Sequence, residues 1–259
     1  MMLRKVICGV VLLIPHVLCA QIIETKTLKD VLNKTDKKTL VVLDIDNTIL
    51  EPRAPRATDQ WFSAMVEHAK SIGYDYPGAV AAVLPMYYQA HATSRVHLVE
   101  PCGAVVIKDL CKKSLAVIAL SSRSLDMIPH TKRQFSQLGI NFTVSGIGRV
   151  RTEFSLHYGL VKFLEGVTYC GNNDKGQALL ALLDRLNLNP KKIVFVDDKE
   201  KNLVTVKQAV ERRKINFMGM RFSGCDAKVK AFVLDEKSKQ LLAPCKKNLQ
   251  SLTLVPVAG

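Results

Sequence analysis

Residues 39–48 read TLVVLDIDNT, and this stretch decides how the rest of the chain is interpreted. Thr39 to Leu43 form a short apolar run, rich in β-branched residues, that stops at an acidic residue, which is typical of a buried parallel strand. Asp44 and Asp46 then follow two positions apart. Side chains two apart on an extended chain point to the same side, so both carboxylates can face one phosphate. The stretch therefore predicts paired carboxylate chemistry at the end of a strand.

Two later runs have the same form. Residues 115–120 (LAVIAL) end at Ser121, and residues 192–196 (KIVFV) end at Asp197. Helical patterns alternate with these runs at 105–112, 126–138 and 176–186. This alternation predicts an α/β fold of the Rossmann-like type, with a mostly parallel sheet and helices on both faces. Because ligands bind at the carboxyl ends of such strands, the polar strand ends are expected to converge on one crevice.

Three stretches depart from this alternation. Residues 58–95 contain two helical patterns broken near 76–78, and we expect them to form a small helical cap inserted over the crevice. Residues 142–173 are rich in glycine, aromatic and β-branched residues, which favours an inserted β-hairpin. Near the C-terminus, residues 228–242 predict one further helix.

The first residues have the layout of a secretory signal. Arg4 and Lys5 precede an apolar run over residues 6–18, which small and polar residues follow. The run is shorter than the roughly 20 apolar residues of a spanning helix. We expect residues 1–20 to be removed and residues 21–259 to form one exported domain, in the periplasm or outside the cell. A lipoprotein is the second alternative, disfavoured because the large Leu18 precedes Cys19.

The chain carries a net charge of +14, and 48% of its residues are hydrophobic. That hydrophobic content is enough for a sizeable core and argues against wholesale disorder. Loss of Arg4 and Lys5 with the signal would lower the charge to +12. Such a surface attracts anions, and phosphorylated small molecules, nucleic acid and anionic lipid stay open as partners.

Taken together, the strand ends resemble the four motifs of the haloacid dehalogenase-like (HAD) superfamily. DIDNT matches the first motif, the run ending at Ser121 the second, and Lys175 at the start of a helix the third. The acidic pair Asp197 and Asp198 matches the fourth, with Asn202 four residues on. The resemblance spans residues 40–221 and is nearest to exported acid phosphatases and secreted relatives.

The resemblance implies roles for four carboxylates. Asp44 would be the nucleophile and a Mg²⁺ ligand, and Asp46 the general acid and base whose backbone carbonyl also binds the metal. Asp198 would be the third protein ligand, with Asp197 supporting the site by hydrogen bonding, although these neighbours could trade roles. Few carboxylates, several waters and a substrate phosphate suit Mg²⁺.

Most of the remaining site residues are expected to bind the phosphate group or to offset its charge. Lys175 and the metal would offset the repulsion between a phosphate dianion and the carboxylates, while Ser121 would hold a phosphoryl oxygen. Asn47, Ser122 and Arg123 are expected to bind substrate, and Arg123 could instead pair with an acidic neighbour. Thr48 is expected to steady the turn after the strand, and Asn202 to support the site.

The expected activity is therefore Mg²⁺-dependent hydrolysis of a phosphomonoester through an aspartyl-phosphate on Asp44. The substrate would be a phosphorylated small molecule, with nucleotides among the candidates. Two alternatives stay open: phosphotransfer to an alcohol, and a non-catalytic, basic, exported binding protein that keeps the same fold.

Overall fold

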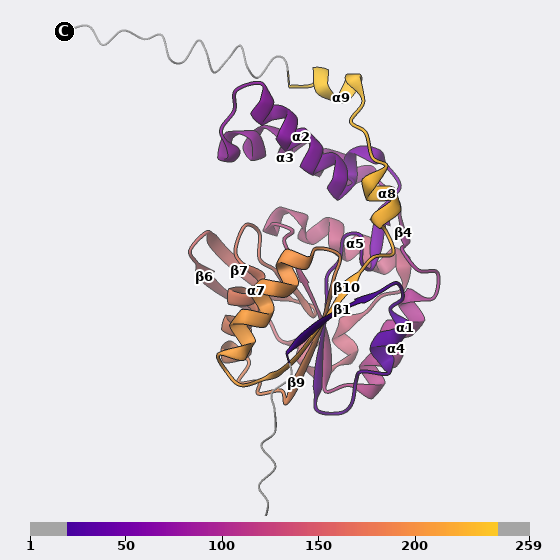
Figure 1. The fold of residues 1–259 in the computed structure, drawn as a ribbon, viewed down its shortest axis with the longest axis vertical. Coiled ribbons are helices and arrows are strands. Elements are labelled where there is room, and N and C mark those ends of the chain that lie inside the picture. The colour runs from indigo at the N-terminus through magenta and orange to yellow at the C-terminus, as the bar shows by residue number, and fades with distance from the viewer. Residues whose placement is uncertain (1–19, 243–259) are drawn as a thin grey trace, which may run out of the picture.

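A computed structural model describes residues 20–242. The expected signal peptide therefore lies outside the described residues except for Ala20. Within them, a central sheet has helices on both faces, and two further helices form a separate layer beyond one end of the sheet (Figure 1). Among the described helices, none is long and apolar enough to cross a membrane.

The sheet has eight strands in the order β1-β10-β9-β2-β5-β8-β7-β6. Their bounds, in that order, are Gln21–Thr25, Asn216–Phe222, Lys192–Asp197, Thr39–Leu43, Ala116–Ser121, Val167–Tyr169, Gly159–Leu164 and Thr152–Leu156. The first six strands in this spatial order, from β1 across to β8, pair in parallel. β7 is antiparallel to both of its neighbours, β8 and β6. The predicted α/β fold with a mostly parallel sheet is confirmed.

The three strands predicted from apolar runs occur in the structure with bounds shifted by one residue at most. They are the adjacent strands β9, β2 and β5 at the centre of the sheet. Sequence reasoning did not identify β1 and β10, which extend the sheet beyond β9.

Two hydrophobic cores lie on the two faces of the sheet. Val41 and Leu43 of β2 belong to the core beneath α1 (Lys29–Leu32), α4 (Gly103–Lys113) and α5 (Ile128–Leu138). Leu40 and Val42 belong to the core beneath α6 (Lys175–Arg185) and α7 (Glu200–Glu211). Figure 1 shows α7 on one side of the sheet and α1 and α4 on the other. Burial of both faces explains why the strand is apolar throughout.

Residues 58–95 contain α2 (Asp59–Ser71) and α3 (Tyr76–Thr93). These helices pack around Trp61, Met65, Val83 and Tyr87 in a third core. The chain enters and leaves this layer through a short antiparallel pair, β3 (Leu50–Pro52) and β4 (Val96–Leu98). Two chain connections and a separate core are compatible with the expected cap, which stays a prediction.

Residues 142–173 contain two 3-10 turns, Phe142–Val144 and Gly146–Arg149, followed by β6, β7 and β8. β6 and β7 form an antiparallel hairpin, and β8 returns the chain to the parallel sheet beside β5. Two more 3-10 turns, Pro55–Ala57 and Leu125–Met127, precede α2 and α5.

The predicted continuous helix over residues 228–242 is wrong. The structure has two short helices, α8 (Asp226–Lys230) and α9 (Glu236–Gln240). Between them, Phe232 and Leu234 pack against the core of α2 and α3. Asp235 then caps α9 by accepting a hydrogen bond from the Ser238 backbone N–H. Packing across to another layer thus replaces the local helical hydrogen bonds that the pattern predicted.

Candidate active site

The polar strand ends lie side by side because their strands are neighbours. Asp44 follows β2, Ser121 ends β5 and Asp197 ends β9. Lys175, at the first residue of α6, joins two of these ends. Its Nζ donates hydrogen bonds to Asp44 Oδ1 at 2.5 Å and to Asp197 Oδ2 at 2.7 Å. The structure therefore brings together four residues that are far apart in the sequence.

Lys175 keeps its positive charge in this setting. Burial alone would lower its pKa, but Asp197 and Asp44 outweigh burial and raise the pKa. The charged ammonium group stands where it can offset the charge of an incoming phosphate.

Asp197 and Asp198 differ in how their carboxylates are used. Asp197 is fully buried, and Asn202 Nδ2 donates to its two oxygens at 2.9 and 3.0 Å. The Lys199 backbone N–H donates to Asp197 Oδ1 at 2.8 Å. Asp198 has one long contact, 3.4 Å from Asn47 Nδ2 to its Oδ2. Asp197 is thus hydrogen-bonded by the protein on both oxygens, whereas Asp198 keeps coordination capacity to spare.

Oxygens of Asp44, Asp197 and Asp198 lie within 4.8 Å of one another. Burial raises the pKa of Asp44 well above its usual range, opposed by Lys175 and reinforced by Asp197. Burial, followed by the charge of Asp197, raises the pKa of Asp198 to about 7. A hard divalent cation with oxygen ligands, such as Mg²⁺, fits this donor set because it would offset the crowding of negative charge.

The carboxylate of Asp46 accepts hydrogen bonds from Arg123, whereas that of Asp44 accepts one from Lys175. Arg123 donates from Nε to Asp46 Oδ2 at 2.9 Å and from Nη2 to Oδ1 at 2.7 Å. Burial alone would raise the pKa of Asp46, but the guanidinium holds it below its usual value. Arg123 is thus paired with an acidic neighbour, and its expected role in substrate binding stays a prediction.

Sequence reasoning missed the residues that hold Arg123. Its Nη1 donates to Thr131 Oγ1 at 2.8 Å and to Gln134 Oε1 at 2.7 Å, both on α5. Gln134 Nε2 in turn lies 3.0 Å from Nδ1 of His91 on α3. The spacing of Thr131 and Gln134, three apart on one helix face, is the only sequence signal that could have linked them.

The remaining predicted residues are placed as follows. Ser121 is buried, and its Oγ accepts from the Arg123 backbone N–H at 3.2 Å. Ser122 is exposed. Asn47 takes the left-handed backbone conformation with φ 59°. Thr48 is buried, but its hydroxyl bonds no described residue, and the turn is closed by backbone hydrogen bonds such as Ile49 N–H to Ile45 O.

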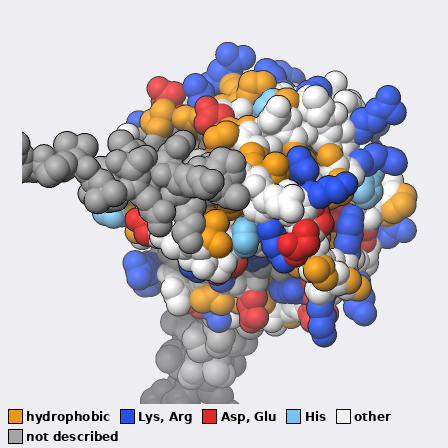
Figure 2. Space-filling model, turned by 90° about the horizontal axis from the view of Figure 1, so that it is seen from above, with side chains coloured by type: hydrophobic (Ala, Val, Ile, Leu, Met, Phe, Trp, Pro, Cys, Tyr) orange, Lys and Arg blue, Asp and Glu red, His pale blue; other side chains and the backbone are white. Residues whose placement is uncertain are grey.

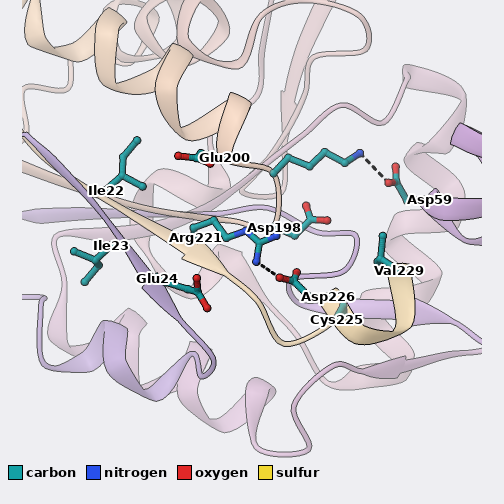
Figure 3. A pocket seen from close by; sticks show the side chains of 11 residues that line it. Ile22, Ile23, Glu24, Asp59, Asp198, Glu200, Arg221, Cys225, Asp226 and Val229 are labelled. Carbon is teal, nitrogen blue, oxygen red and sulfur yellow. Dashed lines mark hydrogen bonds and ion pairs between the residues drawn. The ribbon is translucent and has the colours of Figure 1, made fainter. Parts of the chain in front are cut away.

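A cavity of about 600 Å³ opens beside Asp198 (Figure 3). Lys199 and Asp59 form an ion pair at its rim, with 2.8 Å between Nζ and Oδ2. This pair joins the loop after β9 to the first residue of α2. Arg221 and Asp226 pair on the opposite side. The cavity therefore lies where the sheet, α2 and α8 meet.

Several proteins share limited similarity with this chain. A "Putative outer membrane protein" of Chlamydia muridarum is 21% identical over 71% of this chain and 68% of its own length. An uncharacterized protein of Rickettsia prowazekii is 23% identical over 78% of this chain and 76% of its own.

Among solved structures, a HAD family hydrolase of Salmonella enterica serovar Typhi has a TM-score of 0.38 and 16% identity. The match covers 72% of this chain and 68% of that one. A HAD-superfamily hydrolase of Geobacter sulfurreducens has a TM-score of 0.37 and 14% identity, over 75% of this chain and all of that one.

A family model gives the broadest assignment. It matches residues 23–251, which include the sheet except for the first two residues of β1, the residues at the strand ends and the layer of α2 and α3. The chain therefore belongs to the family described as "Protein of unknown function (DUF2608)".

Proposed function

We propose that this protein is an exported, Mg²⁺-dependent phosphohydrolase of the HAD type that hydrolyses phosphomonoesters of small molecules. The observation that carries the proposal is the buried contact of Lys175 with Asp44 and Asp197, directly beside Asp198. A nucleophilic carboxylate, a fixed cation and a carboxylate with free oxygens are the parts that phosphoryl transfer needs.

Asp44 is the nucleophile in this proposal. Lys175 holds Oδ1 of Asp44, so Oδ2 is the oxygen that attacks phosphorus. The new Oδ2–P bond forms as the bond from phosphorus to the ester oxygen breaks. Water then attacks the aspartyl-phosphate, which releases phosphate and restores Asp44.

Asp46 moves the protons. Arg123 holds the pKa of Asp46 below its usual value, so the resting carboxylate first takes up a proton from solvent as this ion pair opens. Asp46 then gives that proton to the departing ester oxygen and takes one from the attacking water. Both oxygens of Asp46 accept hydrogen bonds from Arg123, so each transfer requires one of these bonds to open. Arg123 keeps the carboxyl pointed at the site between the two steps.

Asp44 and Asp198 would hold Mg²⁺ through carboxylate oxygens, with the backbone carbonyl of Asp46 as a third ligand. When bound, the ion supplies positive charge to the phosphoryl oxygens. Asp197 acts by fixing Lys175, because its oxygens already accept hydrogen bonds from Lys175, Asn202 and the Lys199 backbone.

Export is supported by the signal-like layout of residues 1–20. The names of the chlamydial relatives, which refer to the outer membrane, agree with a location in the cell envelope. The proposed enzyme would then meet its phosphorylated substrates outside the cytoplasm.

The test is phosphate release from p-nitrophenyl phosphate by the purified protein, with Mg²⁺ and with EDTA. We expect turnover with Mg²⁺, loss with EDTA, and loss of at least about a thousandfold in Asp44→Asn, since the amide cannot attack phosphorus. Asp36→Asn, which changes an exposed carboxylate far from the site, is the matched control.

Normal turnover in Asp44→Asn would refute the aspartyl-phosphate mechanism. If glycerol lowers the yield of free phosphate and glycerol phosphate accumulates, the protein is a phosphotransferase. Absence of turnover with a panel of phosphomonoesters would favour the non-catalytic binding protein.

A further inference from the structure

One edge of the sheet collects a surplus of positive charge. Six strands of the sheet, β1, β10, β9, β2, β5 and β8, are parallel to one another. The loops that precede them therefore all lie at the amino-terminal edge of the sheet. The register confirms this alignment: Thr39 and Asn216 both pair with Lys192, and the Leu115 backbone N–H donates to Thr39 O. The candidate active site occupies the opposite, carboxyl edge.

We call the cations at this amino-terminal edge the basic face. Its members are Lys34, Lys37, Lys38, Lys112, Lys113, Lys191, Lys192, Arg212, Arg213 and Lys214. All of them are exposed except the half-buried Lys192. Four carboxylates lie among them, on Asp36, Asp109, Asp184 and Glu211, which leaves an excess of six positive charges.

Several of these lysines are held together without being neutralised. Lys113 Nζ donates to the Leu32 carbonyl at 2.5 Å, and Lys192 Nζ donates to the Lys34 carbonyl at 2.7 Å. Lys37 Nζ likewise donates to the Lys112 carbonyl. Because these acceptors are backbone carbonyls, the bonds tie neighbouring loops together and leave the net charge in place.

The other end of the molecule differs. Figure 2 shows that end, where Lys and Arg side chains are interspersed with acidic and apolar ones. Residues 20–242 contain 33 Lys and Arg and 23 Asp and Glu, a net charge of +10, so this one edge holds six of the ten excess positive charges. A uniform coating that serves solubility would not gather in this way.

An exposed apolar side chain lies within the basic face. Leu115 is 43% exposed and directly follows Lys112, Lys113 and Ser114. The segments that form the face contain no Phe, Tyr or Trp, and eight of its ten cations are lysines. Lysines around an aliphatic side chain suit a lipid headgroup layer, whereas nucleic-acid sites favour arginine and stacking aromatics.

The chain also enters the fold at this edge. Gln21 is the first residue of β1, which runs parallel to β10, so it lies at the same edge as Asn216. The sequence that precedes it includes the apolar run at residues 6–18. Whether or not that segment is removed, the end of the domain that follows it is the basic one.

From this charge, the exposed leucine and the point of chain entry, we propose that the basic face binds an anionic phospholipid surface. Bound in this way, the protein directs the carboxyl edge of its sheet, with Asp44 and the layer of α2 and α3, away from the lipid. The inference does not depend on the proposed phosphohydrolase activity.

The test is co-sedimentation of the purified protein with phosphatidylcholine vesicles, with and without phosphatidylglycerol, over a range of salt. The test variant carries Lys34→Glu, Lys38→Glu and Lys191→Glu, whose ammonium groups donate no hydrogen bond to a described residue. The control variant carries Lys26→Glu, Lys230→Glu and Lys237→Glu, which are exposed, distant from the basic face and equal in charge change.

We expect binding that requires phosphatidylglycerol, weakens with salt and falls at least about tenfold in the test variant while the control variant binds as the wild type does. Equal losses in both variants would mean that only net charge matters and would overturn the proposal. Equal binding to pure phosphatidylcholine would also overturn it. Tighter binding to duplex DNA than to the vesicles, lost in the same variant, would assign the face to nucleic acid instead.

Discussion

At the scale of single residues, the site combines two buried cations that make three ion pairs. Lys175 joins Asp44 and Asp197, and Arg123 grips Asp46. Each cation is buried and hydrogen-bonded to carboxylates, as buried charges must be to persist in a folded protein. The pairs fix where three carboxylates point before any substrate arrives.

Neutralising Asp198 should change the Mg²⁺ dependence of activity, whereas neutralising Asp197 should change the stability of the fold. Asp198→Asn should raise the Mg²⁺ concentration for half-maximal activity at least about tenfold, because an amide is a weaker ligand than a carboxylate. Asp197→Asn should leave Mg²⁺ dependence nearer to wild type but lower the free energy of unfolding by about 3 kcal/mol, because Lys175 loses a buried partner. Mg²⁺ titration of activity and urea unfolding measure the two effects, and the reverse ranking would exchange the two roles.

His91 should make stability depend on pH. It is fully buried, and burial followed by the charge of Arg123 lowers its pKa to about 3. The Gln134 side-chain oxygen accepts from Arg123, so its amide nitrogen donates to Nδ1 of a neutral His91. Between about pH 6.5 and about pH 3, the unfolded chain binds a proton that the folded chain excludes, so stability falls as the pH falls, by about 1.4 kcal/mol per pH unit.

Urea unfolding at pH 7 and pH 5 measures this effect. Wild type should lose about 2 kcal/mol more than His91→Gln on going to pH 5, since glutamine does not titrate. His157→Gln, at an exposed histidine, is the control and should follow wild type. A His91→Gln variant that follows wild type as well would show that His91 titrates normally in the folded state.

At the scale of elements, the position of Lys175 depends on how closely α6 approaches α7. A Cβ atom on Gly176 would lie 2.5 Å from the Thr205 carbonyl oxygen and 2.9 Å from Ala209 Cβ. The residue next to Lys175 therefore has to be a glycine for the two helices to pack at this distance. The glycine that lets α6 and α7 pack closely therefore also fixes the position of the neighbouring Lys175.

Gly176→Ala should separate α6 from α7. We expect a loss of about 1–3 kcal/mol in the free energy of unfolding, in spite of the better helix propensity of alanine, together with reduced activity as Lys175 shifts. Gly146→Ala is the control, because nothing lies within 4 Å of a Cβ there. Unchanged stability and activity in Gly176→Ala would show that α7 moves at no cost.

At the scale of the whole molecule, the layer of α2 and α3 is tied to the sheet at more than its two chain connections. Trp61 Nε1 donates to the buried Ser238 hydroxyl at 2.9 Å, so α9 packs on this layer. Lys228 on α8 pairs with Glu51 on β3 at 2.9 Å. Residues 226–240, which include α8 and α9, therefore form a strap: they run from the sheet, past β3, to the layer of α2 and α3.

The Lys199–Asp59 pair is the tie closest to the cavity. Asp59→Asn should free α2 from the loop after β9 and raise the hydrogen exchange rates of α2 amides, while the unfolding free energy falls by no more than about 1 kcal/mol, because the pair is partly exposed and screened by solvent. Asp75→Asn, at the N-cap of α3, perturbs the layer without touching this pair and serves as the control. Unchanged exchange in α2 of Asp59→Asn would mean that the strap alone holds the layer.

The central strands and the residues at their ends could be predicted from the amino-acid pattern alone. Apolar runs that stop at Asp44, Ser121 and Asp197 predict buried parallel strands, and parallel strands carry their carboxyl ends to one edge, so local pattern is enough to bring those side chains together. The presence of Lys175 at a helix start could also be read from the chain, although its two contacts could not.

The partner of each charged side chain, and the path of the chain beyond the central strands, became known only from the three-dimensional fold. Arg123 meets Asp46, Thr131 and Gln134 across three segments, and no spacing encodes such a contact. The edge strand β1 and the break between α8 and α9 depend likewise on surfaces supplied by distant residues. Periodicity reports which face of an element is buried, whereas the free energy that selects a partner comes from packing and desolvation in the complete fold.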